Sequence, residues 1–127
     1  MKNERIIDRI KNRVVVTAFG RVGFAQFKTV FDEMLDQPDF RANMDILWDL
    51  TDATIEASVI DVQRIVRHIY KNRTRRGSNY KTAIIAVGTT ELAASNLFGI
   101  LASYLPFDTK VFEGIQAAEQ WLDKPIS

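Results

Sequence analysis

The stretch AIIAV, residues Ala83 to Val87, decides the fold class of this chain. Its five residues are all apolar, whereas a strand with one face in water alternates apolar and polar residues. An unbroken run of this length predicts a central strand covered on both faces, as in parallel sheets. The segments on either side should therefore supply neighbouring strands and the helices that cover them.

The half of the chain before this run alternates between strand and helix patterns. Ile6-Ile7 and Val14 to Phe19 predict two short strands in a hairpin. A helical pattern follows from Phe24 to Leu35 and is ended by Pro38. A strand from Ile46 to Leu50 comes next, and then a stripe at helical spacing formed by Val62, Ile65, Val66 and Ile69.

The half after the run continues the alternation. Leu92 to Leu105 predict a helix that stops at Pro106, and Val111-Phe112 predict a last short strand before a closing helix with Ile115, Ala118, Trp121 and Leu122. The order is ββαβαβαβα. It predicts a single α/β domain over residues 1–127, with a mostly parallel sheet, an N-terminal antiparallel hairpin and helices on both faces.

The composition excludes several classes of site. The 127 residues are 46% hydrophobic and 26% charged, which is ordinary for one globular domain. The absence of cysteine excludes disulfides, thiolate metal sites and thiol nucleophiles. No segment has the apolar length of a signal peptide or a membrane span, so we expect a cytoplasmic protein.

Three stretches resemble the SpoIIAA-like family. They are DLTDAT after the third strand, AIIAV itself, and TKVFEGIQAAEQWL near the end of the chain. That family is related to the STAS domains of anti-sigma-factor antagonists and, in fold, to Sec14-type lipid-binding domains. The resemblance covers nearly the whole chain. It implies a non-enzymatic protein-interaction or regulatory module, with binding or carriage of a small apolar ligand or lipid as the alternative.

The expected ligand or partner site is the rim where the parallel strands end. Ligands of open α/β sheets bind beyond the carboxyl ends of the strands. The polar side chains expected at this rim are Arg21, Asp49, Asp52, Thr54, Ser58, Thr89 and Thr90.

Ser58 has two interpretations. By resemblance to STAS antagonists, it occupies the position of their phosphorylated serine, although Ala57 replaces the aspartate that precedes it there. Ser58 and Asp61 also have the spacing of a capping box, which would start a helix. A phosphate here would meet the like charges of Glu56 and Asp61, so capping is the favoured interpretation.

No cofactor or metal is expected. Asp49 and Asp52 have the types needed for acid–base chemistry, but no partner group accompanies them, and such residues more often make turns. The segment from Gly20 to Gly23 lacks the third glycine of a dinucleotide motif and the lysine of a P-loop. His68 is the single histidine and lies on the predicted polar face of its helix, so it should be solvated.

The segment from Arg64 to Lys81 contains seven Lys and Arg residues and no acid. It could attract anionic lipid, nucleic acid or an acidic partner, but a solvated helix end is the default interpretation and nucleic acid is not favoured. Tyr70 within it is expected on the core side.

The helix predicted from Leu92 to Leu105 is too apolar for a helix with a single buried stripe. Phe98, Ile100 and Tyr104 are expected to form an exposed apolar surface. Such a surface usually marks an interface or the mouth of a ligand site. We therefore expect a homodimer, with an apolar ligand as the second interpretation.

Overall fold

The computed structural model describes residues 2–125. Its elements, in chain order, are β1 (Lys2–Asp8), β2 (Arg13–Val22), α1 (Phe24–Leu35), β3 (Asp45–Ile55), α2 (Val59–Lys71), α3 (Arg73–Arg76), β4 (Lys81–Ile85), α4 (Thr89–Leu101), β5 (Asp108–Phe112) and α5 (Ile115–Asp123). Apart from the one-turn helix α3, this is the predicted order.

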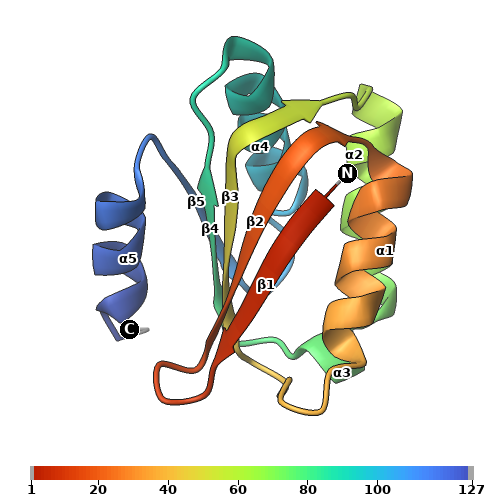
Figure 1. Cartoon of the computed structure of the whole chain (residues 1–127). Helices are drawn as coiled ribbons and strands as arrows, with labels where there is room; N and C mark the ends of the chain where they lie inside the picture. Colours follow the sequence, from red (N-terminus) through yellow and green to blue (C-terminus); the bar gives the residue numbers. More distant parts are fainter. Residues whose placement is uncertain (1, 126–127) are drawn as a thin grey trace.

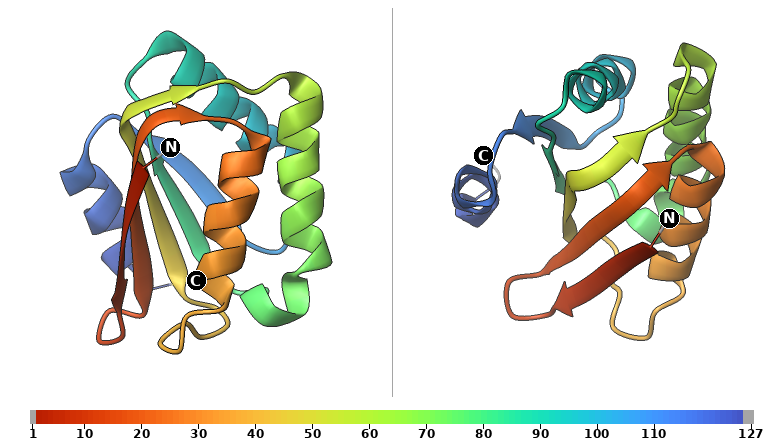
Figure 2. Two further views of the ribbon diagram at one scale, coloured as in Figure 1. Left: turned by 45° about the vertical axis from the view of Figure 1, so that its right-hand side comes forward. Right: turned by 45° about the horizontal axis from the view of Figure 1, so that its top comes forward.

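The five strands form one sheet in the order β1-β2-β3-β4-β5. β1 and β2 are antiparallel, and the other neighbouring pairs are parallel. Helices α1, α2 and α4 cover one face of this sheet, and α5 lies alone on the other face (Figures 1 and 2). The predicted fold class is therefore confirmed, including helices on both faces.

The core has one part on each face. The larger part joins β2 and β3 to α1, α2 and α4, with Val16, Phe31 and Ile46 among its buried members. The smaller part lies under α5 and contains Leu47, Ala83, Ile85, Ala118 and Leu122. Every residue of β4 is buried, as the apolar run predicts, although the strand ends at Ile85 and Val87 is exposed.

The third strand is longer than its apolar run predicts. β3 continues through the DLTDAT stretch to Ile55 and stays paired with β2, whose last residue, Val22, lies opposite Ile55. The register between the two strands shifts between Thr17 and Phe19, opposite Asp49 and Asp52. The expectation of a loop after Leu50 was wrong, because pairing with β2 satisfies the backbone of these polar residues.

Two buried cations hold α5 on the sheet. Arg13, in β2, donates from Nη2 to Asp123 Oδ1 at 2.7 Å. Lys81, in β4, donates from Nζ to the Trp121 carbonyl oxygen at 2.7 Å and also to that of Lys124. The bond from Arg13 lowers the pKa of Asp123 below its ordinary value. These cations therefore bind carbonyl oxygens at the C-terminal end of α5 and the carboxylate of its last residue.

Arg76 also lies inside the protein, which corrects the prediction of a solvated basic helix end. Its side chain is only 2% exposed. The guanidinium donates from Nη1 to the Met44 carbonyl oxygen at 2.7 Å and lies 3.5 Å from the centre of the Tyr80 ring. Burial lowers the pKa of Arg76 to about 10 and raises that of Tyr80 to about 12. Tyr70, expected in the core, is exposed instead.

The raised pKa of Tyr80 predicts a loss of stability at alkaline pH. Its pKa in the unfolded chain is about 10, so the neutral phenol is favoured in the folded state. The resulting stabilisation is complete below pH 10 and is lost as the pH rises through 12. Between pH 8 and pH 11, the wild type should lose roughly 1 kcal/mol more unfolding free energy than Tyr80→Phe. Urea denaturation at both pH values measures this, and parallel losses would contradict it.

Candidate functional site

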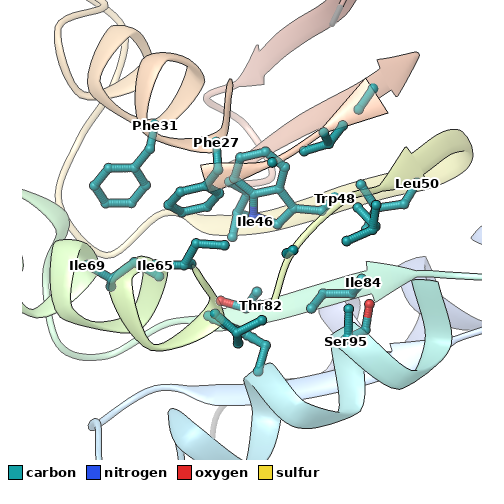
Figure 3. A pocket seen from close by; sticks show the side chains of 18 residues that line it. Phe27, Phe31, Ile46, Trp48, Leu50, Ile65, Ile69, Thr82, Ile84 and Ser95 are labelled. Atoms are coloured by element: carbon teal, nitrogen blue, oxygen red, sulfur yellow. The ribbon is translucent and has the colours of Figure 1, made fainter. Parts of the chain in front are cut away.

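The candidate site is an apolar cavity of about 110 Å³ between the sheet and its three-helix face. Six elements line it, including β2 with Ala18 and Val22, and each contributes the side chains that its apolar periodicity turns inward (Figure 3). They include Phe27 and Phe31 from α1, Ile46, Trp48 and Leu50 from β3, Ile65 and Ile69 from α2, Thr82 and Ile84 from β4, and Ser95 and Phe98 from α4.

Aromatic rings form one wall of the cavity. The Phe27 ring lies 5.5 Å from that of Phe31 and 5.4 Å from that of Trp48, measured between centroids. No Lys, Arg, His, Asp or Glu is among the lining residues. A somewhat larger dry cavity of about 150 Å³, lined by Leu, Ile and Phe in another protein, binds benzene. This cavity therefore has the size and chemistry for a small apolar molecule or for the end of a larger one.

Two polar contacts connect the elements that wall the cavity. His68 Nε2 in α2 lies 2.6 Å from Asp32 Oδ1 in α1. Glu91, in α4, accepts a bond at Oε2 from the backbone N–H of Ile55 at 3.0 Å. Burial favours a higher pKa for Asp32, but bonds from Lys28 and His68 outweigh it and leave that pKa below its ordinary value.

The first of these contacts corrects the prediction for His68. Its side chain is 14% exposed rather than solvated. It packs edge-on against the ring of Phe31 at a centroid distance of 5.4 Å. The helix pattern placed it on the polar face of α2, but α1 covers that face and supplies Asp32.

Most of the predicted rim residues are exposed, and some of them have local partners. Arg21 and Thr54 are opposite each other in the β2–β3 register, and both are exposed, with Arg21 Nε 3.4 Å from Glu56 Oε1. Asp49 Oδ1 accepts bonds from the backbone N–H and hydroxyl of Thr51, which is the local turn chemistry expected of it. Asp52, Thr89 and Thr90 are exposed.

Ser58 forms the predicted capping box at the start of α2. Its Oγ accepts from the Asp61 N–H at 3.2 Å, and its own N–H donates to Asp61 Oδ2 at 3.0 Å. The residue is exposed. Both features agree with a helix cap, and neither tests whether the serine is ever phosphorylated.

Loss of this cap has a measurable cost. Ser58→Ala should lower the free energy of unfolding by roughly 0.5–2 kcal/mol, because the Asp61 N–H loses its acceptor. Ser58→Asp should stay close to the wild type, since a carboxylate can also cap. Chemical denaturation measures both variants. Equal stability of wild type and Ser58→Ala would contradict the capping role.

Of the three residues predicted to form an exposed apolar surface, one points into the cavity and two are exposed. Phe98 lines the cavity and packs 6.5 Å from Phe107, so its expected place on an exposed surface was wrong. Ile100 and Tyr104 are each 69% exposed, as expected. The helix ends at Leu101, before the predicted end, and Leu105 is buried in the turn that follows.

Two cations of the basic segment have acidic partners. Arg75 pairs with Asp36, which caps the end of α1, and Arg64 lies 3.7 Å from Asp61 of its own helix α2 and over the ring of Phe24. Arg76 and Lys81 are buried. Within residues 2–125, no group of three metal-ligating side chains lies together, and no helix is long and apolar enough to cross a membrane.

Of the residues that line the cavity, sequence reasoning named only Phe98 as a possible site residue, and the polar residues that it missed are Thr82 and Ser95. Thr82 adjoins the apolar run of β4, and Ser95 interrupts the apolar residues of α4. A polar residue within a strongly apolar segment is the signal that could have identified them.

The protein is therefore a small α/β domain with an apolar cavity between its sheet and helices α1, α2 and α4. The chain is similar in structure to an uncharacterised protein of the DUF3478 family with a SpoIIAA-like fold from Shewanella loihica PV-4. The TM-score is 0.59, with 18% sequence identity over 94% of this chain and 93% of that chain. The predicted SpoIIAA-like fold is thus confirmed. No model of a protein family matches the sequence, and no curated protein matches it.

Proposed function

We propose that this protein binds a small apolar ligand in the cavity between its sheet and helices α1, α2 and α4. The observation that carries this proposal is the uncharged lining of the cavity, which brings together side chains from six elements. Well-formed apolar pockets with a few polar groups are the usual form of small-molecule sites. The proposal assigns no catalysis to the chain.

Of the two functions expected from the sequence, the cavity favours the ligand binder over the protein-interaction module. A tightly packed core contains few voids larger than a water molecule. Here a void of about 110 Å³ lies beside Phe27, Trp48 and Phe98, which are only partly buried. Ligand binding would gain the dispersion contacts that these side chains lack.

Toluene is a suitable probe because it is close to benzene in size. Added toluene should shift the methyl NMR resonances of Ile46, Ile65 and Ile84, which line the cavity. Those of Leu47 and Ile85 should stay in place, because these residues belong to the core under α5. Shifts in both groups, or in neither, would contradict the proposal.

A matched pair of variants tests the location of binding. Ala94 lines the cavity, whereas its neighbour Ala93 is exposed on the same helix. Ala94→Leu should fill part of the cavity and weaken toluene binding at least tenfold, and Ala93→Leu should leave it unchanged. Equal binding by the two variants would place the toluene elsewhere.

The second candidate function is a protein-interaction or regulatory module that acts as a homodimer. The exposed Ile100 and Tyr104 at the end of α4 favour it, since large exposed apolar side chains often mark interfaces. Ile100→Lys should convert a dimer to a folded monomer in light scattering. Asn96→Lys, an exposed polar position on the same helix, is the control. A monomeric wild type would reject this candidate.

A further inference from the structure

Two hydroxyl groups face the cavity without a protein partner. Thr82 and Ser95 line it, and each residue is only 4% exposed. Among the hydrogen bonds of residues 2–125, none involves Thr82 Oγ1 or Ser95 Oγ, and neither oxygen is among the fully buried side-chain atoms that lack a partner, so both can be reached from the cavity. Other hydroxyls do have partners: Thr29 Oγ1 donates to the Ala25 carbonyl oxygen, and Ser103 Oγ to that of Ile100. Figure 3 shows the oxygen atoms of Thr82 and Ser95 among carbon-lined walls.

An unpaired hydroxyl inside an apolar site is unfavourable for folding. A hydroxyl moved from water into an apolar site loses hydrogen bonds that only a new partner can replace. Alanine in place of Ser95, or valine in place of Thr82, would avoid that cost with little change in volume. A ligand atom that pairs with these hydroxyls offers a reason for their position.

The electrostatics of the cavity restrict the ligand further. No cationic side chain lines it, so a buried carboxylate or phosphate would lose its hydration without gaining a counter-ion. The carboxylates of Glu91 and Asp32, on α4 and α1, are engaged in the contacts that hold the walls together. Their negative charge would also disfavour an anion.

We infer that the ligand is an uncharged molecule with an apolar body and a hydrogen-bonding oxygen, which pairs with the hydroxyl of Thr82 or of Ser95. This inference rests on the proposed function of the cavity. It adds a preference for neutral oxygenated ligands, such as alcohols and phenols, over carboxylates of similar shape.

The experiment compares phenol with toluene, two molecules of nearly equal size that differ by a hydroxyl in place of a methyl group. Affinities are measured by calorimetry for the wild type and for Thr82→Val/Ser95→Ala. The double variant should bind phenol at least tenfold more weakly and toluene at least as tightly as the wild type. Unchanged phenol affinity alongside normal toluene binding would overturn the inference but not the proposed function.

The remaining outcomes are also informative. If the wild type binds neither probe, the proposed function fails, and the inference fails with it.

Benzamide and benzoate test the charge preference, because they have similar shapes. At pH 7, benzamide should bind at least tenfold more tightly than benzoate. Equal affinities would overturn the preference for uncharged ligands.

Folding of the variants is checked separately. Removal of two unpaired hydroxyls should not lower the melting temperature of the unliganded protein. If the double variant fails to fold, each single variant is measured against phenol and toluene in the same way. A melting temperature that falls in both single variants would mean that the hydroxyls have protein partners, which would overturn the inference.

Discussion

Arg76→Ala is expected to reduce the free energy of unfolding by about 3 kcal/mol. The substitution removes a long side chain that is 2% exposed, and it leaves a void beside the rings of Tyr80 and Phe40. It also removes the donor to the Met44 carbonyl oxygen. Equilibrium denaturation in urea measures the loss.

Two neighbouring substitutions separate packing from charge. Arg75→Ala removes the same positive charge from an exposed side chain, which pairs with Asp36. It should lower the free energy of unfolding by less than about 1 kcal/mol. Arg76→Met keeps most of the volume and removes a cation whose pKa is lowered by burial, so most of the lost stability should return. A loss in Arg76→Ala no larger than in Arg75→Ala would show that this residue is not part of the core.

Phe31→Ala is expected to be more destabilising still, by about 3–5 kcal/mol. Phe31 is 2% exposed and contacts the rings of Phe27 and His68. It also lines the cavity, so its truncation should enlarge that cavity rather than create a separate one. Denaturation with and without toluene measures both effects, because a ligand that binds the folded state raises its apparent stability.

Phe24→Ala is the matched control on the same helix. Phe24 is only partly buried and does not line the cavity, so its loss should cost less and should not change toluene binding. If toluene stabilises Phe31→Ala and Phe24→Ala equally and no more than the wild type, the enlarged space is not continuous with the ligand site.

Local patterns were sufficient to predict the fold. The apolar run predicted a strand buried on both faces, and β4 (Lys81–Ile85) is buried throughout, although Val87 at the end of the run is exposed. The capping box at Ser58 was predicted correctly because both of its bonds lie within four residues of the chain. Features of this kind depend on backbone geometry and neighbouring side chains, which the sequence specifies directly.

Predictions failed where a distant partner decides the outcome. His68 was expected in water, but it contacts Asp32 of α1, a residue 36 positions earlier in the chain. The DLTDAT stretch was expected to follow the strand, but β2 pairs with it on both sides of the register shift, which makes it part of β3. Arg76 was expected at a solvated helix end, and the Met44 carbonyl oxygen and the Tyr80 ring enclose it.

The sequence by itself therefore determined the order of the elements, the parallel sheet and the start of α2, because these follow from periodicity and local hydrogen bonding. Only the tertiary structure decided that a cavity exists and which side chains line it. A cavity is the space left when side chains from six elements fail to fill their common volume, and no single segment encodes that difference. The inward position of Phe98 and the unpaired hydroxyls of Thr82 and Ser95 emerge from the same packing.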